Sequence, residues 1–161
     1  MPVKTKLESR ILDEKDKKIL MILQENGRES LSSISKKVKL SIDAVHKRMK
    51  EMQRKGIFLS GIFIDPRVIG FPLIMDIKIK LKNISEKERG EFIDYLKEHK
   101  RVTDLLSIMG DFDITCVLIA KDTNELDKVS TEIRQKYRDL IDDWKAVLVL
   151  KTHKFEYYDL N

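Results

Sequence analysis

The sequence has little of what secreted, membrane-spanning or disulfide-linked proteins are built from. It contains one cysteine, Cys116, among 161 residues, so no disulfide can form within the chain. This favours a reducing, cytoplasmic setting. No apolar run approaches the roughly 18 residues of a membrane helix, so no contact with a membrane is expected. The first ten residues are charged and lack an apolar stretch, and we do not expect them to act as a secretory signal.

Residue patterns of catalytic and phosphate-binding sites are also missing. The three histidines, His46, His99 and His153, lie far apart, and with a single cysteine they give no metal-ligand spacing. The glycines form no Walker or dinucleotide-binding loop. Cys116 falls within an apolar alternation over residues 114–120, which is typical of a small core residue. The sequence therefore predicts no enzyme, no metal site and no cofactor.

Charge is spread unevenly along the chain. Residues 1–60 carry 15 Lys/Arg and 8 Asp/Glu, a net charge of +7, whereas residues 61–161 carry 17 and 19, a net charge of −2. A basic half joined to a slightly acidic half is expected when only one half meets a polyanion. A chance fluctuation on a solvated surface would look the same, so charge alone leaves nucleic-acid binding open.

Three helices are predicted in the basic half. Asp13 is a suitable N-cap for the first, and Asn26-Gly27 ends it. The second covers about residues 31–38. The third covers about residues 42–54 after Ser41, its N-cap, so a turn of only three residues separates the two. Two helices joined by so short a turn are the helix-turn-helix unit.

The segment after these helices predicts a strand and a hinge. Residues 57–64 are rich in β-branched and aromatic side chains, and we interpret them as a strand that forms the wing of a winged helix-turn-helix. Residues 65–72 contain two prolines and Gly70, which is typical of a hinge. The domains expected are therefore residues 1–64, a hinge at 65–72, and residues 73–161.

The remaining chain predicts the order β-α-β-β-α-β. Residues 75–81 alternate strictly between apolar and charged side chains, which indicates a strand with one buried face. Ser85 and Glu88 form a capping box for the helix that follows. Further strands are expected at residues 102–109, 112–120 and 146–151, and a helix at about 123–137. The fold class expected is α+β, with a ferredoxin-like C-terminal domain.

Two short segments between these elements were interpreted as turns. Gly110-Asp111 is a signal for a two-residue hairpin loop between the second and third strands. The adjacent carboxylates Asp142 and Asp143 are expected in a solvated turn after the helix at about 123–137. They are not expected to form a catalytic acid/base pair.

Four motifs in this order resemble the leucine-responsive/asparagine-regulator (Lrp/AsnC, feast/famine) family of transcriptional regulators. They cover an opening segment, a recognition helix, a hinge and a hairpin: Leu12-Asp13-Glu14-Lys15-Asp16, Leu40-Ser41-Ile42-Asp43-Ala44-Val45 with Arg48 and Gly56, Asp65-Pro66-Arg67-Val68-Ile69-Gly70-Phe71, and Gly110-Asp111-Phe112-Asp113. The resemblance extends from about residue 12 to residue 150. It implies a homodimer built by the C-terminal sheets, assembly into tetramers or octamers, binding to partly palindromic promoter DNA, and an amino-acid effector held between dimers.

The third helix is the candidate for the DNA-reading element, because a helix of this kind fits the major groove. Its apolar stripe faces the core, so a polar face is turned outward. The cations on that face are expected to neutralise phosphates. Asp43, His46 and Lys47, near the helix N-terminus, are the candidates for contacts with base edges. Arg48 is expected either to support the fold or to contact phosphate. The predicted DNA-binding residues are Ser41, Asp43, Ala44, His46, Lys47, Arg48, Lys50 and Arg54.

The Gly-Asp hairpin is the candidate for the effector site, at Gly110, Asp111, Phe112 and Asp113. Free backbone N–H groups in such a turn can hold a carboxylate, and an aspartate can accept hydrogen bonds from an ammonium group; an ordinary turn is the alternative. Amino-acid-binding members of the family often carry two threonines at the start of the last strand. This sequence has Trp144 and Ala146 there, so either the effector differs or the pocket is filled.

Two other classes of function stay open at this stage. Sirohaem decarboxylases have the same two-part build, but their basic and histidine residues are not matched at residues 59–62 or at the Gly-Asp hairpin. A small-molecule-sensing or protein-interaction module without DNA binding is the other alternative. The seven Lys/Arg against two Asp/Glu over residues 30–54 favour DNA.

Overall fold

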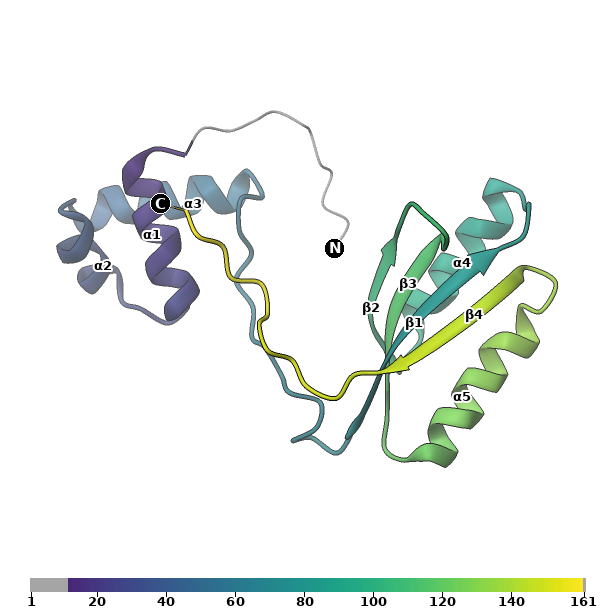
Figure 1. Cartoon of the computed structure of the whole chain (residues 1–161). Helices are drawn as coiled ribbons and strands as arrows, with labels where there is room; N and C mark the ends of the chain where they lie inside the picture. The colour runs from purple at the N-terminus through teal and green to yellow at the C-terminus, as the bar shows by residue number, and fades with distance from the viewer. Residues whose placement is uncertain (1–11, 161) are drawn as a thin grey trace. The chain divides into compact units, whose positions relative to one another are not determined.

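The computed structural model describes residues 12–160 and forms two compact units (Figure 1). One unit comprises residues 12–63 together with residues 154–160, and the other comprises residues 64–153. The sequence predicts that everything after residue 72 belongs to the second domain, whereas the last described residues return to the first unit. None of the described helices is both long and apolar enough to span a bilayer.

The first unit contains the three predicted helices, each begun by a side-chain cap. The carboxylate of Asp13 accepts the N–H groups of the next turn, and the hydroxyls of Ser30 and Ser41 do the same for the second and third helices. Caps of this kind satisfy N–H groups that have no partner inside the helix. The bounds are α1 Glu14–Glu25, α2 Leu31–Val38 and α3 Ile42–Arg54.

The helices meet at a small apolar core. Ile19, Ile34 and Val45 contribute one fully buried side chain each from α1, α2 and α3. Lys15 adds a polar link, because its Nζ donates to the carbonyl oxygen of Val38 at 2.6 Å and so satisfies the last turn of α2. The end of α2, which leads into the short turn of the helix-turn-helix, is thereby tied to α1.

The predicted wing strand is wrong. Residues 57–65 belong to no helix or strand, although they are rich in residues that favour strands. A strand needs a neighbouring backbone to pair with, and the described chain offers none here. Leu59, Ile62 and Phe63 are instead largely exposed. The predicted hinge is an ordered turn, in which Arg67 donates to the carbonyl oxygen of Val149 at 2.9 Å.

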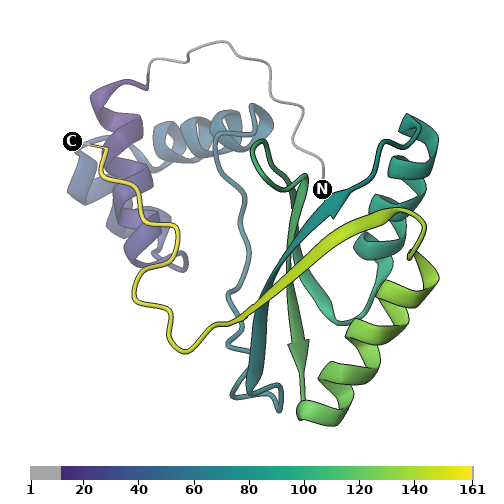
Figure 2. The same cartoon turned by 45° about the vertical axis from the view of Figure 1, so that its right-hand side comes forward.

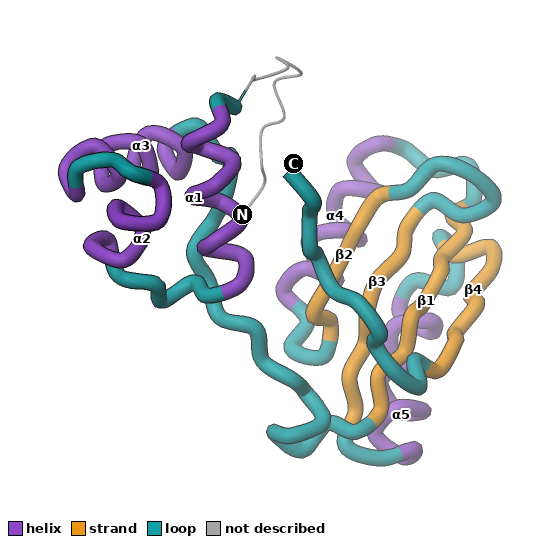
Figure 3. Tube along the Cα trace, turned by 60° about the vertical axis from the view of Figure 1, so that its left-hand side comes forward, coloured by secondary structure: helices purple, strands orange, loops and turns teal. Residues whose placement is uncertain are grey.

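The second unit is a four-stranded antiparallel sheet in the order β2-β3-β1-β4. Both helices lie on the same face of this sheet (Figure 2), and the strands run side by side across it (Figure 3). This arrangement confirms the predicted ferredoxin-like α+β class. The bounds are β1 Leu73–Leu81, α4 Glu86–Glu98, β2 Val102–Ser107, β3 Ile114–Ala120, α5 Thr123–Lys136 and β4 Ile141–Leu148.

The alternation of β1 divides the sheet into a buried and an open face. Ile77 and Ile79 are fully buried and pack with Phe92 of α4 and Ile133 of α5. The capping box of α4 is present as predicted. On the other face, Asp76 accepts a hydrogen bond from the Thr115 hydroxyl at 2.8 Å. One face of β1 therefore builds the core, and the other is polar.

The ends of the sheet differ from the prediction in two places. The last strand begins at Ile141, not at Ala146, so Asp142 and Asp143 lie on β4 and not in a turn that ends α5. The register shifts there, because Lys80 pairs with Asp143 while Leu81 pairs with Ile141. The hairpin between β2 and β3 is also longer than a two-residue turn, spanning residues 108–113.

Candidate nucleic-acid interface and sensing hairpin

The outward face of α3 gathers most of the predicted DNA-binding residues. Asp43, His46, Lys47, Lys50 and Arg54 are exposed. His46 and Lys47 are adjacent, and the other steps along this set are of three or four residues, which places all five along one side of the helix. Val45 and Met52 are buried on the opposite side. The structure therefore presents a continuous polar face that starts at the N-terminus of α3.

Two other predicted residues lie at the start of the helix. Ser41 is exposed and caps α3, since its hydroxyl accepts the N–H of Ala44 at 3.2 Å. Ala44 is half-buried. A hydroxyl that accepts a capping hydrogen bond can still donate its own proton to another acceptor. Ser41 can therefore cap the helix and donate to a phosphate at the same time.

The cations on this face differ in how free they are. Arg54 donates two hydrogen bonds to Glu51, at 2.9 and 2.7 Å, and Lys55 lies 2.9 Å from the same carboxylate. The hydrogen bond from Arg54, and then that from Lys55, lowers the pKa of Glu51 to about 2. Across residues 12–160, no ion-pair partner is found for Lys47 or Lys50. These two lysines are the cations most available to a phosphate.

Arg48 stands apart from the other predicted DNA contacts. It is only about one third exposed, and its Nη1 donates to Asp13 at 2.5 Å and to Asp16 at 2.9 Å. The backbone N–H of Asp16 and then the Arg48 guanidinium hold the pKa of Asp13 below its ordinary value. Asp13 thus caps α1 and binds α3 with one carboxylate. Arg48 joins the two helices instead of extending outward.

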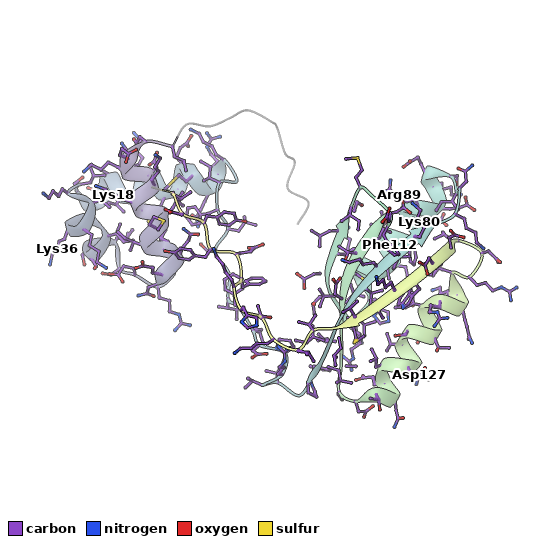
Figure 4. The ribbon with its side chains drawn as sticks, viewed as in Figure 1. Lys18, Lys36, Lys80, Arg89, Phe112 and Asp127 are labelled. Carbon is purple, nitrogen blue, oxygen red and sulfur yellow. The ribbon has the colours of Figure 1, made fainter. Side chains whose placement is uncertain are left out.

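A second group of lysines lies on α1 and α2. Lys18 and Lys36 are exposed on these helices (Figure 4). Lys37 is less free, because its Nζ lies 3.0 Å from Glu29. The pKa of Glu29 is lowered, first by its hydrogen bond from Ser33 and then by that from Lys37. The charge of Lys37 is therefore partly neutralised by a carboxylate that lies just before α2.

The predicted effector residues occupy the hairpin between β2 and β3. Gly110 has φ +145°, a conformation that favours glycine. Asp111 is exposed and Phe112 is half-buried. Phe112 lies at the same end of the sheet as Lys80 of β1 (Figure 4). Of the two aspartates, only Asp111 projects freely into solvent.

Asp113 has a structural contact that the sequence did not indicate. Its carboxylate accepts the N–H of Leu81 at 2.8 Å, and its own N–H donates to the carbonyl oxygen of Ile79 at 3.0 Å. Lys80 lies 3.6 Å from the same carboxylate. Leu81 sits where the pairing of β1 with β4 shifts register, so Asp113 supplies an acceptor at an irregular point of the ladder.

An open pocket of about 430 Å³ lies between α5 and β4. Trp144, at one of the two positions where the family's amino-acid binders carry threonine, is among the residues that line this pocket. Arg134 of α5, Arg138 just beyond its end, and Asp142 and Asp143 of β4 also contribute to its lining. The two arginines were not among the expected site residues, although their spacing of four residues, about one helical turn, at the end of α5 indicates neighbouring positions. The full lining is Thr131, Arg134, Gln135, Arg138, Ile141, Asp142, Asp143 and Trp144.

The single cysteine lies in the core of the second unit. Cys116 is buried, and desolvation raises the pKa of its thiol to about 12, so it is a core residue as the sequence indicated. Among residues 12–160, no three His, Cys, Asp or Glu side chains are close enough together to hold a metal ion.

Family models match both units of the chain. Residues 12–53 match the AsnC-type helix-turn-helix domain, and residues 76–158 match the Lrp/AsnC ligand binding domain. The first match contains α1, α2 and α3. The second match contains most of β1, the other three strands, the hairpin and the pocket between α5 and β4.

Curated relatives match over nearly their whole length. The HTH-type transcriptional regulator Ptr1 of Methanocaldococcus jannaschii is 32% identical over 148 residues, which cover 89% of this chain and 95% of Ptr1. The HTH-type transcriptional regulator FL11 of Pyrococcus horikoshii is 29% identical over 150 residues, which cover 89% of this chain and 92% of FL11.

Solved structures share the fold. A transcriptional regulator of Neisseria meningitidis, crystallised in complex with L-methionine, gives a TM-score of 0.80 at 24% identity and covers 90% of this chain and 94% of its own. AsnC of Escherichia coli gives a TM-score of 0.80 at 23% identity, covering 92% of this chain and 99% of its own.

Proposed function

The chain belongs to the Lrp/AsnC family of DNA-binding transcriptional regulators, and from that premise we propose which residues carry recognition. The outward face of α3 enters the major groove, where Asp43, His46 and Lys47 lie near the helix N-terminus and reach base edges. Lys50 and Arg54 neutralise phosphates. The observation that carries this proposal is that these five exposed residues share one face of α3.

The residues at the edge of this face have supporting roles. Ser41 caps α3 and hydrogen-bonds a phosphate, and Ala44 lets the groove floor approach the helix. Arg48 is a positioning residue, because both carboxylates that it binds lie on the first turn of α1. It fixes the angle of α3 against α1, in place of the direct DNA contact considered from the sequence.

The regulator acts as a homo-oligomer with at least a dimer as its binding unit. A single helix-turn-helix of this size contacts only a few base pairs, whereas two copies related by a two-fold axis read half-sites about one helical turn apart. A dimer built by the C-terminal sheets, and its assembly into tetramers or octamers, follow from the family. The working compartment is the cytoplasm, as the single cysteine indicated.

An amino acid or a close relative is the proposed effector. The structurally similar regulator from Neisseria meningitidis was solved with L-methionine, and the ligand-binding domain of the family covers residues 76–158 of this chain. The hairpin with Gly110, Asp111 and Phe112 contributes backbone N–H groups and one free carboxylate. The Asp113 carboxylate already accepts the N–H of Leu81 on β1. Asp111 is therefore the hairpin carboxylate that contacts the effector.

The pocket between α5 and β4 is the second part of the proposed effector site. Its lining offers guanidinium groups from Arg134 and Arg138 for a carboxylate, and carboxylates from Asp142 and Asp143 for an ammonium group. Such a pair of opposite charges suits a zwitterion. Trp144 adds an apolar wall.

Substitution of α3 lysines tests the DNA interface. Lys50→Ala should weaken binding to duplex DNA by several-fold and reduce the slope of log affinity against log salt by about 1, whereas Lys47→Ala should weaken binding by several-fold and relax the base preference. Lys18→Ala is the matched control, because it removes one exposed cation from α1 of the same unit. Equal losses in all three variants would mean that net charge, and not α3, determines binding.

The effector proposal is tested by thermal shift of the intact protein against the proteinogenic amino acids. An effector that binds the native state raises the melting temperature. Asp111→Ala and Arg134→Ala should each remove this rise, whereas Arg28→Ala, in the helix-turn-helix unit, should retain it. A rise that survives both substitutions would place the effector elsewhere.

A further inference from the structure

The chain beyond β4 does not end as a loose tail on the second unit. After β4 it leaves the sheet, and residues 154–160 pack with the helix-turn-helix unit, as Figure 1 shows in yellow. This segment contains no helix or strand. Undocked termini are commonly disordered and polar. Here four of seven residues are apolar or aromatic: Phe155, Tyr157, Tyr158 and Leu160.

One side chain of α1 binds the backbone of this segment at both of its polar groups. The Nε2 of Gln24 donates to the carbonyl oxygen of Tyr158 at 3.0 Å, and the N–H of Tyr158 donates to the Oε1 of Gln24 at 2.9 Å. A carboxamide offers one donor and one acceptor side, so it matches the two polar groups of a single extended residue. This pairing recognises backbone and does not depend on the tyrosine side chain.

Apolar contacts lie on both sides of that pairing. Two residues further on, Leu160 is partly buried and packs against the core of the helix-turn-helix unit. Three residues before it, the ring of Phe155 meets Phe63 edge-on, with centroids 5.2 Å apart. This geometry is in the favourable range for aromatic pairs. Three separate positions of the segment are therefore held.

From these contacts we propose that the DNA-binding unit carries a peptide-docking site on α1, centred on Gln24, and that its ligand is the C-terminal segment 154–160 of the same chain. Recognition combines main-chain hydrogen bonds with apolar anchors, the usual means by which proteins bind extended peptides. The contacts lie on α1 and residue 63, so the outward face of α3 stays open to DNA. The segment continues from β4 and gives the two units a second covalent connection, besides the one through residues 64–72.

Hydrogen exchange of the intact protein tests the docking site. In Gln24→Leu, which keeps the size of the side chain but removes both hydrogen bonds, amides of α1 should exchange roughly tenfold faster. The matched control is Gln53→Leu, which removes the hydrogen bond of another glutamine, to Ser60 in the same unit. Exchange in β1 and β3 should not change. Equal α1 exchange in wild type and Gln24→Leu would overturn the proposal.

A truncated chain that ends at His153 provides a second test, in case the substitution disturbs α1 itself. Loss of the segment should speed exchange in α1, and a synthetic peptide of residues 153–161 should restore protection in a saturable way. A peptide with Leu160→Asp should not. Restoration by both peptides, or by neither while α1 remains folded, would contradict a specific docking site.

Crosslinking decides whether the segment docks within one chain. Glu25→Cys combined with Tyr157→Cys places thiols next to Gln24 and Tyr158, and the buried Cys116 contributes little background. A short bismaleimide should give a product of single-chain mass, which neither single variant gives. A product of two-chain mass would show that a second copy supplies the segment, which overturns docking in the same chain. DNA affinity is not the readout here, so this proposal can fail independently of the assignment of α3.

Discussion

The guanidinium of Arg48 on α3 donates to the carboxylate of Asp16 on α1 across 2.9 Å. The same Nη1 also reaches Asp13, the residue that caps α1. One cation therefore links α3, the helix proposed to read DNA, to the beginning of the first helix. The pair is partly shielded from solvent, since Asp16 is only 19% exposed. Ion pairs of this kind contribute more to the free energy of unfolding than freely exposed pairs do.

Replacing Arg48 by methionine should destabilise the helix-turn-helix unit by about 1 kcal/mol. This loss of stability is larger than that expected for an exposed ion pair and smaller than that for a fully buried one. Chemical unfolding followed by helical circular dichroism measures it. Arg54→Met is the control, because Arg54 pairs with Glu51 inside a single exposed helix and should matter far less. Equal effects would remove the special role of Arg48.

Acid should weaken the same junction. The pKa of Asp13 is lower in the folded protein than its ordinary value of 3.8. Its contribution to stability is therefore complete above that value and is lost as the pH falls through the folded pKa. Asp13→Asn keeps a capping side chain but cannot ionise, so its stability should fall less between about pH 5 and about pH 3. Parallel curves for both proteins would contradict this account.

The two aspartates of the hairpin should separate in their effects on stability. Asp113→Ala leaves the N–H of Leu81 without its acceptor and should lower the free energy of unfolding by about 1–3 kcal/mol. Asp111→Ala should change it by less than about 0.5 kcal/mol, because that side chain is exposed. Urea titration of both variants is sufficient. A larger loss for Asp111 would invert their assigned roles.

Cys116 should be unreactive in the folded protein. Its thiol is 1% exposed and its pKa is raised to about 12 by desolvation, so the reactive thiolate is rare at neutral pH. Iodoacetamide should label it only after the sheet unfolds, and mass spectrometry can count the adducts. Rapid labelling of the native protein would show that β3 opens easily.

Helices were predictable because their signals are local. Asp13, Ser41 and Ser85 each satisfy N–H groups within four residues of themselves, so their sequence context is sufficient to place the start of a helix. The strict alternation of β1 was equally legible, since one face of that strand is buried and the other is not.

Strand ends and long-range contacts were not predictable in the same way. Residues 57–64 have strand-forming side chains but find no pairing partner among residues 12–160, whereas Asp142 and Asp143 look like a turn but lie on β4, where Asp143 pairs with Lys80 of β1. Pairing depends on what lies opposite, which a single sequence does not state. The bond from Gln24 to Tyr158 spans 134 positions and left no local pattern.

The most direct test of the central claim is selection of duplexes from a random DNA pool by the purified full-length protein at about physiological salt. A regulator that reads DNA with α3 from two copies should enrich a two-fold-related motif, with half-sites about one or two helical turns apart. Lys47→Ala should lose that enrichment, whereas Lys18→Ala should retain it. Binding without any enriched motif, or a motif unaffected by Lys47→Ala, would contradict the assignment of α3 as the reading helix.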